Sequence, residues 1–125
     1  MACNKTKQKK YMFLFYSKKE EINSKECDLV ICVKKGVKRK EELFEIFSSK
    51  LQFPIYFGEN WDAFYDCLCD LKNFHKRKIL ILHEELPFKE SKEERKIYID
   101  LLFDFESFFS SDPSYKIDIA FPVFL

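Results

Sequence analysis

The sequence has very little glycine, no excess of charge of either sign and no long apolar run. Gly36 and Gly58 are the only glycines among 125 residues, and they stand far apart, so a glycine-rich loop that cradles phosphates is excluded. Lysine and arginine number 22 against 21 acids, which gives a net charge of +1. This near balance argues against a general nucleic-acid binder, which carries a clear basic excess. No apolar run approaches the ~20 residues of a transmembrane helix.

Cysteine is present in a pattern that fits neither a disulfide framework nor a zinc site. The five cysteines are an odd number and include no C-x-x-C pair. They are Cys3, Cys27, Cys32, Cys67 and Cys69. We interpret them as free thiols of a reducing compartment. The histidines add no ligand set, because His75 lies in a lysine-rich segment and His83 ends an apolar run, where a structural role is the more common one. We expect no metal and no other cofactor.

Residues 1–28 are interpreted as an N-terminal extension. Residues 1–10 are polar and basic and are expected to be disordered, and the aromatic run from Tyr11 to Tyr16 is expected to add an edge strand. Together they resemble a signal peptide only superficially. The apolar run is shorter than the ~7–15 residues that such a peptide needs, and Lys18 and Lys19 end it. The protein is therefore expected in the cytoplasm.

Residues 29–125 alternate short apolar runs with amphipathic stretches, which are interpreted as one domain. Continuous runs such as Leu29 to Val33 are typical of buried parallel strands. Asn60 is a good helix N-cap, and Ser91 with Glu94 three residues later is a capping-box pattern. The predicted strands are 29–33, 79–82 and 117–121, and the predicted helices are 41–51, 60–71 and 91–109.

Strands that alternate with helices predict a parallel sheet with right-handed crossovers. The predicted fold class is therefore α/β, with a small three-stranded parallel sheet packed with helices. The N-terminal run at 11–16 is expected to extend this sheet at one edge.

The segment 51–71, LQFPIYFGENWDAFYDCLCDL, holds four acids and no lysine or arginine. It therefore carries −4, and because the whole chain carries +1, the rest carries +5. Asp62, Asp66 and Asp70 are spaced four residues apart and share one side of the predicted helix. The apolar residues Trp61, Phe64, Leu68 and Leu71 share another side, which is expected to face the core.

Two of the four acids have an ordinary structural explanation. Glu59 and Asp62 lie where the helix begins, and acids there interact favourably with the helix dipole. Asp66 and Asp70 lie in the C-terminal half, where an acid costs about 0.3–1 kcal/mol, and no basic residue four positions away offsets them. The pattern favours a surface made for a cationic partner, with an ordinary solvated surface as the alternative.

The run P-I-Y-F-G-E-N-W-D-A-F-Y-D-C-L, from Pro54 to Leu68, resembles the barstar family of ribonuclease inhibitors. In that family a proline, an aromatic pair, G-E-N and D-A-x-x-D-C-L recur in the same register. The order of elements extends the resemblance from Leu29 to about Phe121, whereas residues 1–28 have no counterpart in the smallest members. The resemblance implies a barstar-like fold and an inhibitor, not an enzyme, that fills a nuclease's basic active site with an acidic helix.

The resemblance also implies roles for individual residues. Asp66 matches the acid that enters the nuclease's phosphate site and pairs with its arginines, and Asp62 matches a second acid that contacts the basic rim. Tyr56 matches an aromatic residue that packs on a catalytic histidine. Asn60 and Tyr65 match flanking interface positions.

Two further positions complete the predicted interface. Asp70 extends the acidic surface, although Cys69-Asp70-Leu71 stands where the family usually has a small pair and an aromatic residue. In the family, a glutamate of the following long helix also contacts the nuclease. We expect Glu106 or Asp104 to make this contact in the present chain.

The expected partner is a basic ribonuclease, bound by a monomer in a 1:1 complex, with no direct contact to nucleic acid or membrane. One alternative keeps the fold but replaces the nuclease by another basic protein. A second alternative is an enzyme that uses Asp62 and Asp66 as acid and base or as Mg²⁺ ligands. It is weak, because both acids would lie on an exposed convex helix without the pocket that catalytic carboxylates need.

Overall fold

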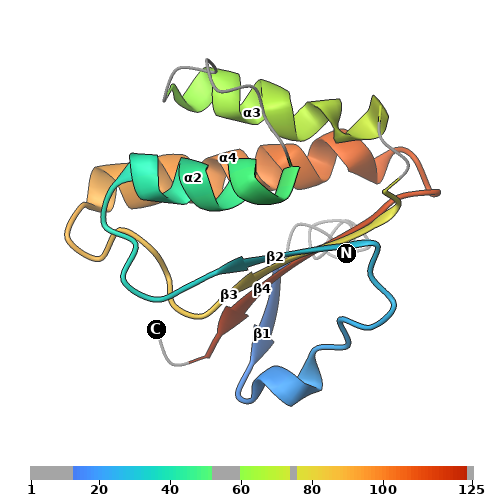
Figure 1. The fold of residues 1–125 in the computed structure, drawn as a ribbon, viewed down its shortest axis with the longest axis horizontal. Helices are drawn as coiled ribbons and strands as arrows, with labels where there is room; N and C mark the ends of the chain where they lie inside the picture. Colours follow the sequence, from blue (N-terminus) through green and yellow to red (C-terminus); the bar gives the residue numbers. More distant parts are fainter. Residues whose placement is uncertain (1–12, 52–59, 74–75, 124–125) are drawn as a thin grey trace, which may run out of the picture.

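A computed structural model describes residues 13–51, 60–73 and 76–123, and Figure 1 shows α helices stacked on one face of a single sheet. The strands are β1 (Phe13–Tyr16), β2 (Leu29–Val33), β3 (Lys78–His83) and β4 (Lys116–Pro122). The α helices are α2 (Lys40–Leu51), α3 (Trp61–Cys69) and α4 (Lys92–Ser110), and the short 3₁₀ helices are η1 (Lys19–Glu21) and η3 (Asp70–Asn73). Each predicted element is present within a few residues of its expected bounds. The expectation of disorder in residues 1–10 lies outside the described residues.

All neighbouring strands in the sheet run parallel, in the order β1-β4-β3-β2. The predicted three-stranded parallel sheet is therefore confirmed as β4-β3-β2. The predicted N-terminal edge strand is confirmed as well, because Phe13 of β1 pairs with Ile119 of β4. Pro122 is the last residue of β4, a position that tolerates its missing N–H group.

The main core lies between the sheet and the helices. Alternate residues of β2, β3 and β4 face the helices, among them Ile31, Ile81 and Ile119, each fully buried. The predicted apolar stripe of α2 is buried against them: Leu43, Phe44, Phe47 and Leu51. Figure 1 shows α3 as the helix farthest from the sheet, above α2 and α4. The side of α3 that faces away from the sheet carries the exposed residues Asp62 and Asp66.

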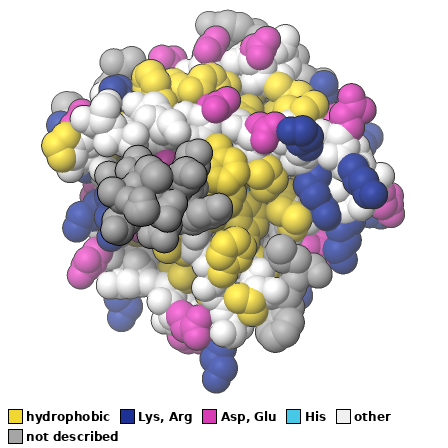
Figure 2. Space-filling view, turned by 180° about the vertical axis from the view of Figure 1, so that it is seen from behind, with side chains coloured by type: hydrophobic (Ala, Val, Ile, Leu, Met, Phe, Trp, Pro, Cys, Tyr) yellow, Lys and Arg dark blue, Asp and Glu magenta, His cyan; other side chains and the backbone are white. Residues whose placement is uncertain are grey.

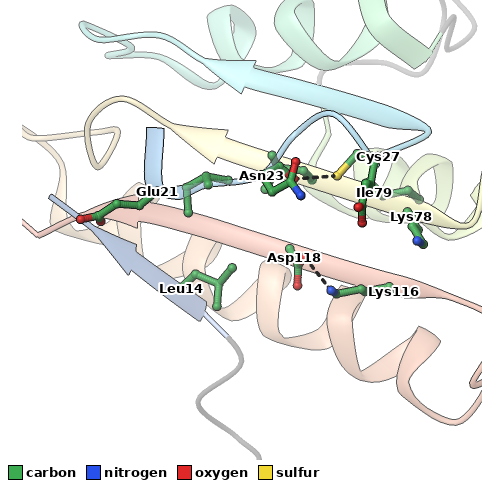
Figure 3. Close-up of a pocket in the computed structure, with 11 residues that line it drawn as sticks. Leu14, Glu21, Asn23, Cys27, Lys78, Ile79, Lys116 and Asp118 are labelled. Carbon is green, nitrogen blue, oxygen red and sulfur yellow. Dashed lines mark hydrogen bonds and ion pairs between the residues drawn. The ribbon is translucent and has the colours of Figure 1, made fainter. Parts of the chain in front are cut away.

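The opposite face of the sheet is covered only in part. Ile22 and Cys27, from the segment between β1 and β2, pack there on Tyr16, Leu80 and Ala120. A pocket lies between this segment and the strands (Figure 3), and charged side chains of both signs line it: Glu21, Glu26, Lys78, Lys116 and Asp118. Such a mixed lining selects no class of ligand. None of the helices in the described part of the chain has the length and apolar character needed to cross a membrane.

His83 is completely buried at the end of β3 and joins β4 to α4. Its Nδ1 atom is 3.0 Å from the carbonyl oxygen of Ala120, and its Nε2 atom is 2.6 Å from the hydroxyl of Tyr98. Because a carbonyl can only accept, Nδ1 carries the proton and the Tyr98 hydroxyl donates to Nε2. The Tyr16 hydroxyl donates to the main-chain oxygen of His83 over 2.5 Å, which ties β1 to the same point. The structural role predicted for His83 is confirmed.

The first prediction concerns the pH dependence of stability. Burial lowers the pKa of His83 from 6.5 to about 3, so between these values the unfolded chain binds a proton that the folded chain does not. Stability is therefore lost as the pH falls through this window, by roughly 2 kcal/mol between pH 7 and pH 5. We expect His83→Gln to be less stable at pH 7 but to show a flatter pH dependence. Urea unfolding at pH 7, 6 and 5 measures both slopes, and parallel slopes would contradict the assignment.

The second prediction concerns the core side of α3. Phe64 is fully buried, so Phe64→Ala is expected to lower the free energy of unfolding by roughly 3–5 kcal/mol. Phe15→Ala is the matched control, because the same atoms are removed from a side chain that is 59% exposed. Urea denaturation compares the two variants. If the Phe64→Ala protein unfolds like the wild type, Phe64 does not face the core, and the assignment of the two sides of α3 is wrong.

Candidate protein-binding surface on helix α3

Asn60 fixes the start of α3 as the sequence predicts. It is in an extended conformation, and its side-chain oxygen accepts hydrogen bonds from the main-chain N–H groups of Asp62, at 2.7 Å, and Ala63, at 3.3 Å. This N-cap satisfies donors that have no partner inside the helix. The exposed Asn60 amide group then has only its NH₂ donors left for another molecule.

The outer side of α3 carries exposed carboxylates spaced one turn apart. Asp62, Asp66 and Asp70 are all exposed, and none of them belongs to the ion pairs found among the described residues. The predicted single helix to Leu71 is divided in the structure, because α3 ends at Cys69 and Asp70 begins η3. The N–H of Asp70 still donates to the carbonyl oxygens of Asp66 and Leu68, so Asp70 continues the same turn. Figure 2 shows acidic side chains at the top of the molecule, where Figure 1 places α3.

The inner side of α3 is apolar and holds the helix in place. Phe64 and Leu68 are fully buried, and Leu71 of η3 is 1% exposed. Trp61 packs against the core but stays partly exposed, and its indole N–H donates to the Glu94 carboxylate of α4 over 2.9 Å. The predicted division of α3 into an anionic and an apolar side is therefore present in the structure.

Tyr65 links the acidic surface to α4. It is partly buried, and its hydroxyl donates to the main-chain oxygen of Asp104 over 3.3 Å. Burial, with smaller contributions from a hydrogen bond to Cys69 and nearby acids, raises the pKa of Tyr65 to about 12. The phenol is therefore neutral at physiological pH and adds no charge of its own.

The structure distinguishes between the two acids of α4 that the sequence offered. Asp104 is exposed beside Tyr65, whereas Glu106 is only 8% exposed. Burial, and secondarily the charge of Asp118, raises the pKa of Glu106. The two acids stand two residues apart and so point to different sides of the helix. Asp104 therefore borders the acidic surface in the free chain, and a contact of Glu106 or Asp104 with a partner stays a prediction.

Tyr56 and Glu59 lie outside the described residues, so the structure assigns them no place beside this surface. The thiols of Cys67 and Cys69 lie in α3 as free cysteines, like Cys27 and Cys32. Burial is the main cause that raises the pKa of both thiols of α3, and both are therefore protonated at neutral pH. Among the described residues, no three histidine, cysteine or acidic side chains gather where a metal ion could bind.

The position of the carboxylates suits contact with another protein. The carboxylates stand exposed on the outside of a helix, whereas the pocket of Figure 3 lies on the far side of the sheet. Carboxylates held on a rigid helix can pair with arginine, lysine or protonated histidine side chains of another protein through charge-assisted hydrogen bonds.

Comparison with known proteins gives one finding. The family model described as barstar (barnase inhibitor) matches residues 28–119, which span β2, β3, the first part of β4 and the described helices α2, α3 and α4. No curated protein matches the chain. Strand β1 precedes the matched segment.

The third prediction follows from the position of the acids along α3. Asp66 lies in the last turn, where the helix dipole disfavours a negative charge, so Asp66→Asn is expected to raise the free energy of unfolding by about 0.3–1 kcal/mol. Asp62→Asn is the matched control. It relieves the repulsion with one acid of the row rather than two and loses a favourable interaction in the first turn, so little net gain is expected.

Urea unfolding at low ionic strength measures both variants, and high salt should reduce the difference between them. An equal gain in stability from the two substitutions would exclude the helix dipole as its cause.

Proposed function

The chain belongs to the barstar family, and from this membership we propose that it inhibits a ribonuclease of the barnase kind inside the cell. In this proposal, the outer side of α3 enters the basic active site of the nuclease and blocks it. The family is one of inhibitors, and we propose that this chain likewise has no catalytic activity of its own.

The observation that carries the proposal is the row of exposed carboxylates on α3 and at the start of η3. A ribonuclease must bind phosphate groups, so its active site gathers arginine, lysine and histidine side chains. Asp62, Asp66 and Asp70 are exposed and form none of the ion pairs of the described residues, so they are available to such groups. The N-cap at Asn60 and the buried Phe64 hold the helix before binding, which lowers the entropy lost on association.

Asp66 is the central residue of the proposed interface. It has one acid a turn before it and one a turn after it, so its carboxylate is the one most completely surrounded when a partner binds. Asp62 and Asp70 contact the basic rim on either side. Tyr65 and Asp104 form the border on α4. A contact of Tyr56 with a catalytic histidine remains a prediction of the resemblance.

The stoichiometry and the compartment belong to the same proposal. The acidic surface of α3 and η3 has room for one nuclease per monomer in this proposal. The free cysteines Cys27, Cys32, Cys67 and Cys69 support a reducing compartment, as expected of the cytoplasm.

A basic partner other than a nuclease would use the same surface. An assay of RNA cleavage by barnase with increasing inhibitor separates the two functions, since only a true inhibitor abolishes cleavage.

The fourth prediction tests the central acid. Asp66→Ala is expected to weaken the binding of barnase by more than ~2 kcal/mol, because a desolvated partner charge would be left unpaired. The free energy of unfolding should be unchanged or slightly higher. Titration calorimetry and inhibition of RNA cleavage provide the measurements.

Glu20→Ala is the matched control. Glu20 is an exposed acid of η1, outside the proposed interface, and its removal is expected to leave affinity nearly unchanged. If the two substitutions weaken binding equally, Asp66 has no special role and the loss reflects net charge alone.

A further inference from the structure

Phe108 is an exposed aromatic side chain on α4 beside the acidic surface. It is 41% exposed, and the other large apolar side chains that are exposed among the described residues, Leu14, Phe15 and Val123, belong to β1 or follow β4. Phe108 stands four residues after Asp104, so the two are neighbours on one side of α4. The acidic surface therefore borders on an aromatic ring.

In the free protein, the ammonium group of a lysine already lies over this ring. The Nζ atom of Lys72, from η3, lies 4.7 Å from the centre of the Phe108 ring. The main chain of Lys72 is held in place, because the Tyr115 hydroxyl donates to its carbonyl oxygen over 3.0 Å. The ring is held as well, edge-on against the buried Phe109 with centroids 5.2 Å apart.

Lys72 makes this contact in place of an ion pair. Asp70 stands only two residues before it, yet Lys72 belongs to none of the ion pairs found in the described part of the chain. An aromatic ring attracts a cation that lies over its face, and acids nearby strengthen the attraction. Phe108, with Asp104 on the same side of α4, is thus a cation-binding position that the chain fills with its own lysine.

We propose that Phe108 is a second anchor point for the nuclease, which takes an arginine guanidinium of the partner in place of Lys72. This inference rests on the proposed function and adds a requirement for the partner. A guanidinium can stack flat on the ring while its N–H groups pair with the Asp104 carboxylate, which a lysine ammonium cannot do in the same way. We therefore expect the chain to bind more tightly to a nuclease that has an arginine able to reach Phe108 while Asp66 occupies the phosphate site.

The proposal assigns opposite effects to the two side chains. Loss of the ring weakens binding, whereas loss of Lys72 strengthens it, because the arginine then no longer displaces another cation. Removal of any positive charge near an acidic surface also strengthens the binding of a basic protein. The test must therefore separate the ring contact from net charge, and a double-mutant cycle does this.

The experiment measures barnase binding to the full chain by stopped-flow mixing and calorimetry. The variants are Phe108→Leu, Lys72→Met and the two combined, with Lys76→Met as a control that removes an exposed lysine of the segment before β3. Phe108→Leu is expected to weaken binding about 2–5-fold. Lys72→Met should strengthen it about 2–5-fold in the wild-type background and much less in the Phe108→Leu background. Urea unfolding verifies that each variant folds.

Three outcomes would overturn the proposal while the proposed function stands. The first is unchanged affinity of Phe108→Leu while Asp66→Ala still weakens binding. The second is an equal gain in affinity from Lys72→Met in both backgrounds, and the third is a gain from Lys76→Met as large as that from Lys72→Met, since net charge would then explain the effect. If the wild-type chain and all variants fail to bind barnase, both the proposed function and this inference are rejected.

Discussion

The position of the acidic surface depends on the burial of Phe64. Helix α3 has nine residues, too few to be stable in isolation, so its place is set by tertiary contacts. The Phe64 ring stacks on Phe44 with centroids 4.7 Å apart and meets Phe47 edge-on at 5.0 Å. Because successive residues of a helix are separated by a fixed rotation, an inward Phe64 forces Asp62 and Asp66 outward. A hydrophobic contact thus determines where the charge is displayed.

The features that are local in sequence could be predicted from it. The N-cap at Asn60, the spacing of the acids and the apolar stripe of α2 each depend on residues within two turns of one another, and all are present in the structure. The apolar runs of β2 and β3 likewise identify buried parallel strands. Local patterns suffice here because propensity, capping and burial favour the same conformation.

The features that depend on distant residues could not be predicted. No pattern places β1 beside β4, more than 100 residues later in the chain, and the different exposure of Asp104 and Glu106 depends on the rotation of α4 about its axis. Trp61 reaches Glu94, and Lys72 reaches Phe108, across separate elements. An exposed phenylalanine such as Phe108 has no sequence signal that separates it from the fourteen others. Only the structure shows that the ammonium group of Lys72 lies over the Phe108 ring.

Strand β1 has a consequence for the solubility of shorter forms of the chain. It lies outside the family-matched segment, yet it covers the outer edge of β4 and is tied to the sheet through Tyr16 and His83. A chain trimmed to residues 28–119 would leave the N–H and C=O groups of that edge without their partners. Exposed strand edges act as templates for pairing between molecules. With β1 in place, the free edge on that side of the sheet is a four-residue strand instead of the seven-residue β4, and a short edge strand is a poorer template for such pairing.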